Sequence, residues 1–484
     1  VCVVKGNLRS TGFSLRQLSE NIRNGNISPT ELIEVCIDKI KNLNPELGAF
    51  ITVVEEEKLI KNALAAENEI KNGNYRGPLH GIPFSVKDIF YVKGLRCTCG
   101  SRILADCIPE SNATVVKRMK DAGAILVGTN TLNEFASGIT GINPFYGSSK
   151  NPWDASRLSG GSSGGSAVAV ATGMVMISLG TDTGGSVRVP ASLCGVVGLK
   201  PTYGRISRHK IFPLSPTLDH EGCITRSAWD SAAVLEYIAG RDPFDDSTAF
   251  NKVEPYTKNL EEPNLEKRRI GVLKRYFCDS LHPEVSALFD QFTELLHSAS
   301  AEIIYDLNIR QTNKFYDSWR DIRLAEAANV HRKWLNNSTT SYEYSDEVRQ
   351  MLVAGTKIAA VDYILSMETV REIRNAFLGL ISARNLDAFV VPTTIIPAPR
   401  FGQEKVNVGR NTILDTRQAL LRNTIVFNSA GLPSVSIPIG LTKKDNLPLG
   451  AQIIGAPFKE ETILSIAYCY ERINNSLSKF VVQS

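Results

Sequence analysis

Seven glycine and serine residues in a row, GGSSGGS at positions 160–166, lie inside a continuous apolar region, and this placement constrains the fold strongly. Such composition is typical of a flexible linker between domains. Here, however, AVAVATGMVMISLG (167–180) follows directly and is apolar over the length of a helix and a strand. The sequence therefore predicts a loop inside one folded core.

The rest of the chain alternates between strand-like and helix-like segments. A helix pattern at 113–122 leads through Gly123 into the apolar run AILVG, and Ser28-Pro29 opens another helix as N-cap and first helical residue. This alternation predicts an α/β fold around a mostly parallel or mixed sheet. Further strands are expected at 81–90, 174–180, 269–274, 388–393 and 434–440, with helices from about 283 and 460.

Composition excludes several classes of protein. The 54 basic and 50 acidic residues give a net charge of +4 without long runs, so no nucleic-acid-binding patch is expected. No stretch approaches 18 consecutive apolar residues, and the first residues lack a signal-peptide pattern. We therefore expect a cytoplasmic protein with no membrane association.

The cysteines show no framework of disulfides or metal ligands. There are nine, an odd number, and the only cluster is Cys97, Cys99 and Cys107. This spacing lacks the second cysteine or histidine pair of a structural zinc site. Free thiols and no bound metal are expected.

The sequence GGSSG (160–164) matches the G-x-S-x-G pattern of a nucleophile elbow, which requires a strand directly before the serine. WDASRLSG precedes it instead, so the context does not fit. None of the six histidines is clearly placed as a partner, and a Ser-His-Asp triad stays only as an alternative.

A better elbow lies downstream in GTDTGGSVRVPA (180–191). It follows the apolar strand and precedes a helix, and the two glycines before Ser186 permit a tight turn. Consecutive backbone N–H groups near a helix N-terminus can bind a developing oxyanion. The pattern therefore indicates Ser186 as an exposed nucleophile whose own loop forms the oxyanion hole.

Three motifs together resemble the amidase signature family: Lys87 in GIPFSVKD, the GGSSGGSAVAVA loop, and GTDTGGSVRVPASLCGVVGLKPTYGR. Lys87 and Ser162 are 75 residues apart, and Ser162 and Ser186 are 24 apart, as in that family. The resemblance implies one domain over 1–484 with a large, mostly parallel mixed twisted sheet covered by helices on both faces. It also implies a catalytic core at 80–230 and no cofactor. The helix-patterned segment 309–386 is expected to form a cap.

The family resemblance implies a role for each motif residue. Ser186 attacks an amide carbonyl, and Ser162, held by a cis peptide, relays the proton to Lys87. Burial in an apolar strand is expected to lower the pKa of Lys87 enough for it to act as the base. The implied oxyanion hole is Thr183, Gly184, Gly185 and Ser186, and the implied supporting residues are Ser163, which hydrogen-bonds the triad, and Asp182 and Arg188, which brace the loop.

The substrate is less constrained. The family includes the glutaminase subunit of Glu-tRNA(Gln)/Asp-tRNA(Asn) amidotransferases, which holds glutamine with an arginine and an aspartate. The aspartate position falls on Leu421 here, no arginine motif can be placed around 325–334, and DHEG stands where that subunit has Asp-Gln-x-Gly. These differences favour a stand-alone amidase that converts neutral aliphatic or aromatic primary amides to the acid and ammonia.

The amidotransferase glutaminase is the first alternative, and a non-catalytic binding protein on the same fold is the second. The expected partner is a small amide, with self-association as a homodimer left open. The candidate pocket residues are Phe135, Gly138, Phe145, Tyr146 and His220.

Overall fold

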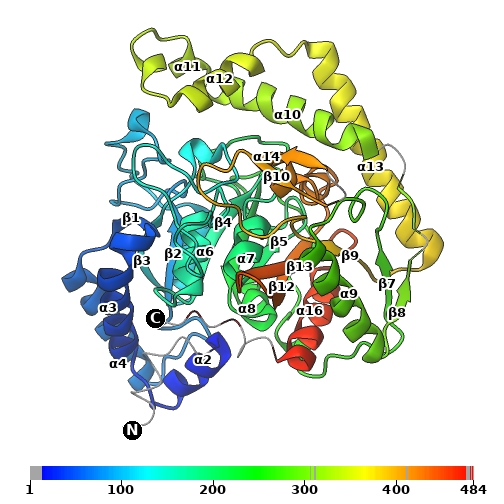
Figure 1. Ribbon diagram of the computed structural model, residues 1–484. Helices are drawn as coiled ribbons and strands as arrows, with labels where there is room; N and C mark the ends of the chain where they lie inside the picture. The colour runs from blue at the N-terminus through cyan, green and yellow to red at the C-terminus, as the bar shows by residue number, and fades with distance from the viewer. Residues whose placement is uncertain are drawn as a thin grey trace.

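The computed structural model describes residues 14–305, 307–309, 312–409, 412–475, 480 and 482. Its centre is an 11-stranded sheet in the order β1-β3-β2-β4-β6-β5-β12-β13-β9-β7-β8 (Figure 1). The strands are β1 Phe50–Val53, β2 Pro83–Lys87, β3 Ile125–Asn130, β4 Ile177–Asp182, β5 Val197–Lys200, β6 His220–Thr225, β7 Arg269–Val272, β8 Glu302–Ile304, β9 Ala388–Pro392, β12 Ser434–Leu441 and β13 Pro448–Ile454. A separate two-stranded sheet pairs β10 Lys405–Asn407 with β11 Ile413–Asp415.

The sheet is mixed. Strands β3, β2 and β4 are parallel to one another, and so are β9, β7 and β8. Antiparallel pairs join the strands between these two blocks, from β4 through β6, β5, β12 and β13 to β9, and β1 is antiparallel to β3. The expected parallel pairing thus holds within the two blocks, whereas antiparallel pairs make up the middle of the sheet.

Local sequence determines where many of the helices begin. Ser14 and Ser28 cap their helices with a side-chain oxygen, and each forms a capping box with the residue three positions on. The N-terminal helices are α2 Leu15–Arg23, α3 Pro29–Leu47, α4 Glu56–Lys71 and α5 Thr114–Asp121. The remaining core helices are α6 Gly164–Ala171, α7 Arg188–Cys194, α8 Ala228–Ile238, α9 Pro283–Ser298 and α16 Glu460–Asn474, with the short helices α14 Thr416–Leu421 and α15 Ile425–Ser429.

Helices cover both faces of the sheet. Every residue of α6 and α7 is buried. A β-carbon on Gly198 of β5 would meet Ala191 of α7, so this residue faces α7. Its strand neighbours Val197 and Leu199 point to the opposite face, where they share a core with residues of α8 and α16.

The segment 309–386 is largely helical. It contains α10 Phe315–Val330, α11 Arg332–Leu335, α12 Asp346–Gly355 and α13 Ala360–Arg384. In Figure 1 these helices lie together along the upper and right-hand margin, away from α2 and α3. Among the described helices, none combines the length and apolar character that crossing a bilayer demands. The cysteines in the described part of the chain are free.

Candidate active site

Lys87 is the last residue of β2, at the end of a parallel block where neighbouring strands β3 and β4 also end. Its side chain is 0 % exposed. The Nζ atom donates hydrogen bonds to Ser162 Oγ and to Thr181 Oγ1, each at 2.8 Å. The lysine thus reaches the Gly/Ser loop and strand β4 together.

The electrostatic surroundings favour a neutral Lys87. Burial lowers the pKa of Lys87 to about 7, although the carboxylates of Asp219 and Asp182 act in the opposite direction. Near neutral pH a substantial fraction of the amine is therefore unprotonated. Such an amine can accept a proton from a serine hydroxyl.

The Gly/Ser loop presents Ser162 to Lys87. The peptide bond between Gly161 and Ser162 is cis, and Ser162 is fully buried. Ser163 lies directly before α6. Its hydroxyl donates to the backbone carbonyl of Thr181 at 3.2 Å, and its N–H donates to the carbonyl of Ser186 at 3.2 Å. Ser163 therefore joins the two loops, and the hydrogen bond that it donates to Ser186 goes to the backbone carbonyl of that residue.

Ser186 lies in the turn between β4 and α7. The turn needs glycine at two positions: Gly185 has a φ of +139°, and a β-carbon on Gly184 would approach the Trp319 ring to 2.7 Å. The Gly185 N–H already donates to Asp182 Oδ1 at 2.7 Å. Within the described residues, the N–H groups of Thr183, Gly184 and Ser186 have no such partner. These three amides are the available donors for an oxyanion.

Asp182 and Arg188 stabilise the turn that contains Ser186. Both are 0 % exposed and form an ion pair, with Arg188 Nη2 2.9 Å from Asp182 Oδ1. Burial opposes ionisation of Asp182, but the charge and hydrogen bonds of Arg188 outweigh it and keep the pKa of Asp182 well below its usual range. Arg188 also donates to the backbone carbonyl of Thr424 and to the side-chain oxygens of Asn428 and Gln452.

A second buried carboxylate, Asp219, supports the same turn from the loop before β6. Its Oδ1 accepts from Thr183 Oγ1 at 2.6 Å, and its Oδ2 accepts from the N–H groups of Leu214 and Ser215. Burial raises the pKa of Asp219 to about 6. Glu326 of α10 fastens this loop by accepting hydrogen bonds from Ser215 Oγ, from Thr217 N and Oγ1, and from Tyr363 Oη.

Ser186 opens into a cavity of about 610 Å³ between the turn and the helices α10 and α12. Thr183 and Gly184 line it beside the serine. On the helical side it is lined by both apolar and charged groups. The remaining lining residues are Ala136, Ser137, Gly138, Ile139, Leu214, Tyr316, Trp319, Arg323, Asp346, Glu347, Gln350, Met351, Arg417 and Leu421.

Of the candidate pocket residues, the structure places only Gly138 on this cavity. Phe135 is fully buried and packs against Phe212 and His331. Phe145 and Tyr146 lie under the guanidinium groups of Arg102 and Arg96. His220 is buried on β6, where its Nδ1 is 2.7 Å from the carbonyl oxygen of Leu218. These aromatic rings pack against other side chains of the protein. An aromatic residue in the sequence therefore does not by itself indicate a ligand-binding position.

The helical side of the cavity contains residues that the motifs do not include. Trp319 donates from its indole N–H to the carbonyl of Thr183 at 2.9 Å. The Arg323 guanidinium lies 4.9 Å from the centre of the Trp319 ring, and its Nη1 is 3.0 Å from Met351 Sδ. No sequence pattern marks these residues. No arginine motif could be placed around 325–334 from the sequence, and the structure places Arg323, just before that segment, on the cavity together with Asp346 and Glu347.

In this α/β fold the buried Lys87 donates a hydrogen bond to Ser162, and Ser186 lies in a nearby glycine-containing turn. This arrangement defines the class of hydrolases that use a serine–lysine site. The chain belongs to the amidase family, whose model matches residues 31–464. It is therefore an enzyme that hydrolyses carbon–nitrogen bonds in amides.

Curated relatives cover almost the whole chain. The A subunit of the glutamyl-tRNA(Gln) amidotransferase from Desulfotalea psychrophila is 35% identical, over 96% of this chain and 98% of its own length. The protein of the same name from Legionella pneumophila strain Corby is 35% identical, over 96% and 97%. These relatives favour the amidotransferase alternative over the stand-alone amidase preferred from the sequence.

Solved structures of both kinds are similar. A protein from a vestigial complex that reveals the origins of an s-triazine catabolic enzyme has a TM-score of 0.89 and 31% identity, covering 95% of this chain and 98% of its own. A crystallised amidase gives 0.84 and 34%, with coverage of 95% and 99%. The A subunit of the Thermotoga maritima glutamyl-tRNA(Gln) amidotransferase gives 0.79 and 33%, covering 96% and 95%.

Proposed function

We propose that the chain hydrolyses the primary amide of a small substrate that carries a carboxylate, with glutamine as the representative substrate. The observation that carries this proposal is the arrangement of Lys87 and Ser162 behind a cavity that contains both Ser186 and Arg323. Lys87, Ser162 and Ser186 supply the chemistry, and Arg323 supplies a positive charge that orients the substrate.

In the proposed reaction Ser186 Oγ attacks the amide carbonyl while its proton passes through Ser162 to neutral Lys87. The N–H groups of Thr183, Gly184 and Ser186 stabilise the oxyanion. The proton then returns to the nitrogen as the C–N bond breaks, and ammonia leaves an acyl-enzyme on Ser186. Water, deprotonated by the same relay, frees the acid.

Arg323 is suited to hold a carboxylate. Burial lowers the pKa of Arg323 to about 10, so the guanidinium remains charged at neutral pH. Within the described residues it has no carboxylate within ion-pair distance, because Glu347 pairs instead with Arg417 at 2.6 Å. Its Nε atom is buried without a hydrogen-bond partner. A planar guanidinium with free donors is the preferred protein group for a carboxylate.

The ammonium group of an amino-acid substrate also finds charge in the cavity. Asp346 and Glu347 lie at the start of α12 and line the same space. These residues replace the aspartate whose position is Leu421 here. The relatives are subunits of an amidotransferase named for glutamyl-tRNA(Gln), and we propose that this chain likewise works with further subunits rather than as a homodimer.

Ammonia release from glutamine and from a neutral aromatic amide, by the wild type and Arg323→Met, tests this substrate class. We expect the variant to raise KM for glutamine at least about tenfold, since a charge-assisted hydrogen bond contributes about 1.5–3 kcal/mol. KM for the neutral amide should change less than about twofold. Arg320→Met, on the exposed side of the same helix, is the control.

A neutral aromatic amide is the second candidate, because Tyr316, Trp319 and Leu421 give the cavity an apolar wall. If glutamine is turned over at least about tenfold less efficiently than the neutral amide, and Arg323→Met changes neither, the carboxylate proposal is wrong. In that case the stand-alone amidase preferred from the sequence is the better description.

A further inference from the structure

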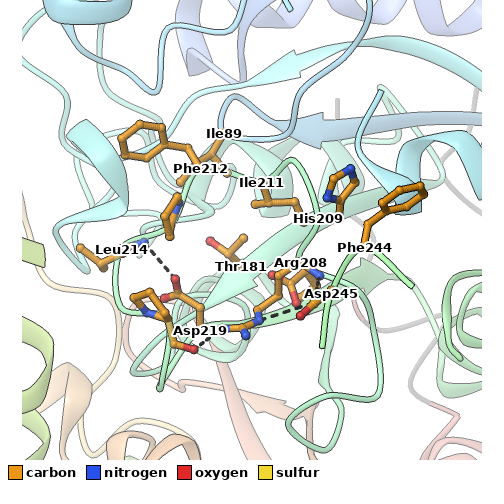
Figure 2. Close-up of a pocket in the computed structure, with 13 residues that line it drawn as sticks. Ile89, Thr181, Arg208, His209, Ile211, Phe212, Leu214, Asp219, Phe244 and Asp245 are labelled. Carbon is orange, nitrogen blue, oxygen red and sulfur yellow. Dashed lines mark hydrogen bonds and ion pairs between the residues drawn. The ribbon is translucent and has the colours of Figure 1, made fainter. Parts of the chain in front are cut away.

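A smaller cavity, of about 230 Å³, lies on a different side of the site and reaches a hydrogen-bond partner of Lys87 (Figure 2). Its lining includes Thr181, whose hydroxyl accepts the 2.8 Å hydrogen bond from Lys87 Nζ. Figure 2 shows Thr181 among the lining residues, with Asp219 and Arg208 beside it. Phe244 on the rim is 74% exposed, so the cavity extends from solvent to the partner of Lys87.

This cavity and helix α7 lie on opposite faces of the sheet. β-Carbons on Gly180 and Gly222 would each meet Val187, at the start of α7. Thr181 and Glu221, which follow and precede those glycines, therefore point to the opposite face. The two are direct cross-strand partners in the β4–β6 ladder. Cross-strand partners have β-carbons about 4.5–5.5 Å apart, so Glu221 lies beside the Thr181 hydroxyl.

Glu221 places a buried carboxyl on the wall of this cavity. It is 4% exposed, and within the described residues no side chain donates a hydrogen bond to its carboxyl oxygens. The carboxyl accepts a hydrogen bond from its own backbone N–H, and its remaining acceptor capacity is available to water in the cavity. The structure also leaves Arg208 Nε, which lines the same cavity, without a hydrogen-bond acceptor.

We propose that Glu221 exchanges protons with Lys87 through the Thr181 hydroxyl and water in the cavity of Figure 2. Protonated Lys87 gives a proton to Thr181 Oγ1 as the threonine's own proton passes through water to the Glu221 carboxylate. The products are neutral Lys87 and protonated Glu221, which releases its proton to solvent at the rim. The route serves the proposed reaction, because Lys87 can lose its proton while substrate fills the cavity around Ser186.

Burial acts on both members of the pair, and each favours its neutral form. Burial raises the pKa of Glu221 well above its usual value, while Arg208 lowers it and Asp219 and Asp245 raise it further. Burial lowers the pKa of Lys87 to about 7. The other titratable groups on the cavity and its wall are His209 and Tyr203.

The rate at which a small alkyl fluorophosphonate labels Ser186 tests the route without depending on the natural substrate. In this step the Ser186 O–P bond forms, fluoride leaves, and the hydroxyl proton passes through Ser162 to Lys87. The rate constant at saturating reagent is compared for wild type and Glu221→Gln at two pH values, about one unit below and about two units above the pKa of Lys87.

We expect Glu221→Gln to slow labelling about tenfold at the lower pH and less than twofold at the higher pH, where Lys87 is already neutral. Glu221→Asp should retain most of the rate, and imidazole or formate should restore part of it in Glu221→Gln. Glu471→Gln, which changes a buried carboxyl that accepts from the Ala228 N–H, is the matched control.

An unchanged or faster rate for Glu221→Gln at the lower pH overturns the proposal, since loss of a negative charge alone lowers the pKa of Lys87 and raises the rate. A slower rate at both pH values, without rescue by small acids or by Glu221→Asp, shows a structural role and also overturns it. If labelling persists in Lys87→Ala, Lys87 is not the base, and the proposed reaction itself is wrong rather than the Glu221 route alone.

Discussion

Ser186 has a small side chain that is 5% exposed, and the structure shows no hydrogen bond from its hydroxyl to another described residue. Ser186→Ala should therefore reduce ammonia release at least about a thousandfold, as loss of a nucleophile does. Its melting temperature should stay within about 2 °C of the wild type, because little packing is lost. Residual activity above this level would place the nucleophile elsewhere.

The lowered pKa of Lys87 leads to a specific prediction for the pH dependence of activity. The proposed reaction needs the neutral form of Lys87, whose pKa is lowered to about 7. The value of kcat/KM should fall about tenfold for each pH unit below that pKa and level off above it. Lys87→Ala should lose nearly as much activity as the Ser186 variant. A His331→Gln or His220→Gln variant that removes activity while Lys87→Ala keeps it would support a histidine-based triad instead.

At residue scale the sequence predicted the contact between Lys87 and Ser162 better than the lining of the cavity. Lys87 is the last residue of strand β2 and Ser162 lies in the loop before α6, and motifs with fixed spacing record that arrangement. Phe135 and His220 were wrong as cavity residues, because hydrophobicity reports burial and not the direction in which a ring points. The contact of Arg323 with Met351 joins two helices, and nothing in the local sequence shows it.

At the scale of elements, the contact between α10 and the loop before β6 is a specific prediction. Glu326 holds both Ser215 and Thr217 of that loop. Glu326→Gln should lower the free energy of unfolding by about 1–3 kcal/mol, because charged hydrogen bonds are weakened and an amide donor faces other donors. Urea denaturation measures the change. Glu368→Gln, at an exposed position of α13, should change stability by less than about 0.5 kcal/mol.

Most elements of the sheet were predictable, and their order was not. The apolar runs at 81–90, 174–180 and 434–440 became β2, β4 and β12, and the helix expected from about 460 begins at Glu460. Local patterns determine such segments. The pairing of β5 with both β6 and β12 depends on contacts between residues far apart in sequence. The alternation of strands and helices along the chain therefore could not predict the antiparallel pairs in the middle of the sheet.

For the whole molecule, the buried ion pair of Asp182 and Arg188 links the catalytic turn to the C-terminal third of the chain. Arg188→Met should destabilise the protein by about 3–5 kcal/mol, since Asp182 is left as an uncompensated buried charge. Arg349→Met, which breaks an exposed pair with Asp346, should cost less than about 1 kcal/mol. Equal midpoints of chemical denaturation for the two variants would contradict this role.

The hydrogen bond from Arg188 to Gln452 spans 264 residues, and this has a consequence for protein synthesis. A ribosome adds about 5–20 residues per second, so roughly 13–50 s separate the translation of these two positions. For most of that interval the nascent polypeptide contains Lys87, Ser162 and Ser186 but lacks both Asn428 and Gln452 as acceptors for the arginine. We therefore expect a product truncated before Asn428 to lack hydrolytic activity, because the arginine beneath the catalytic turn has neither of these partners.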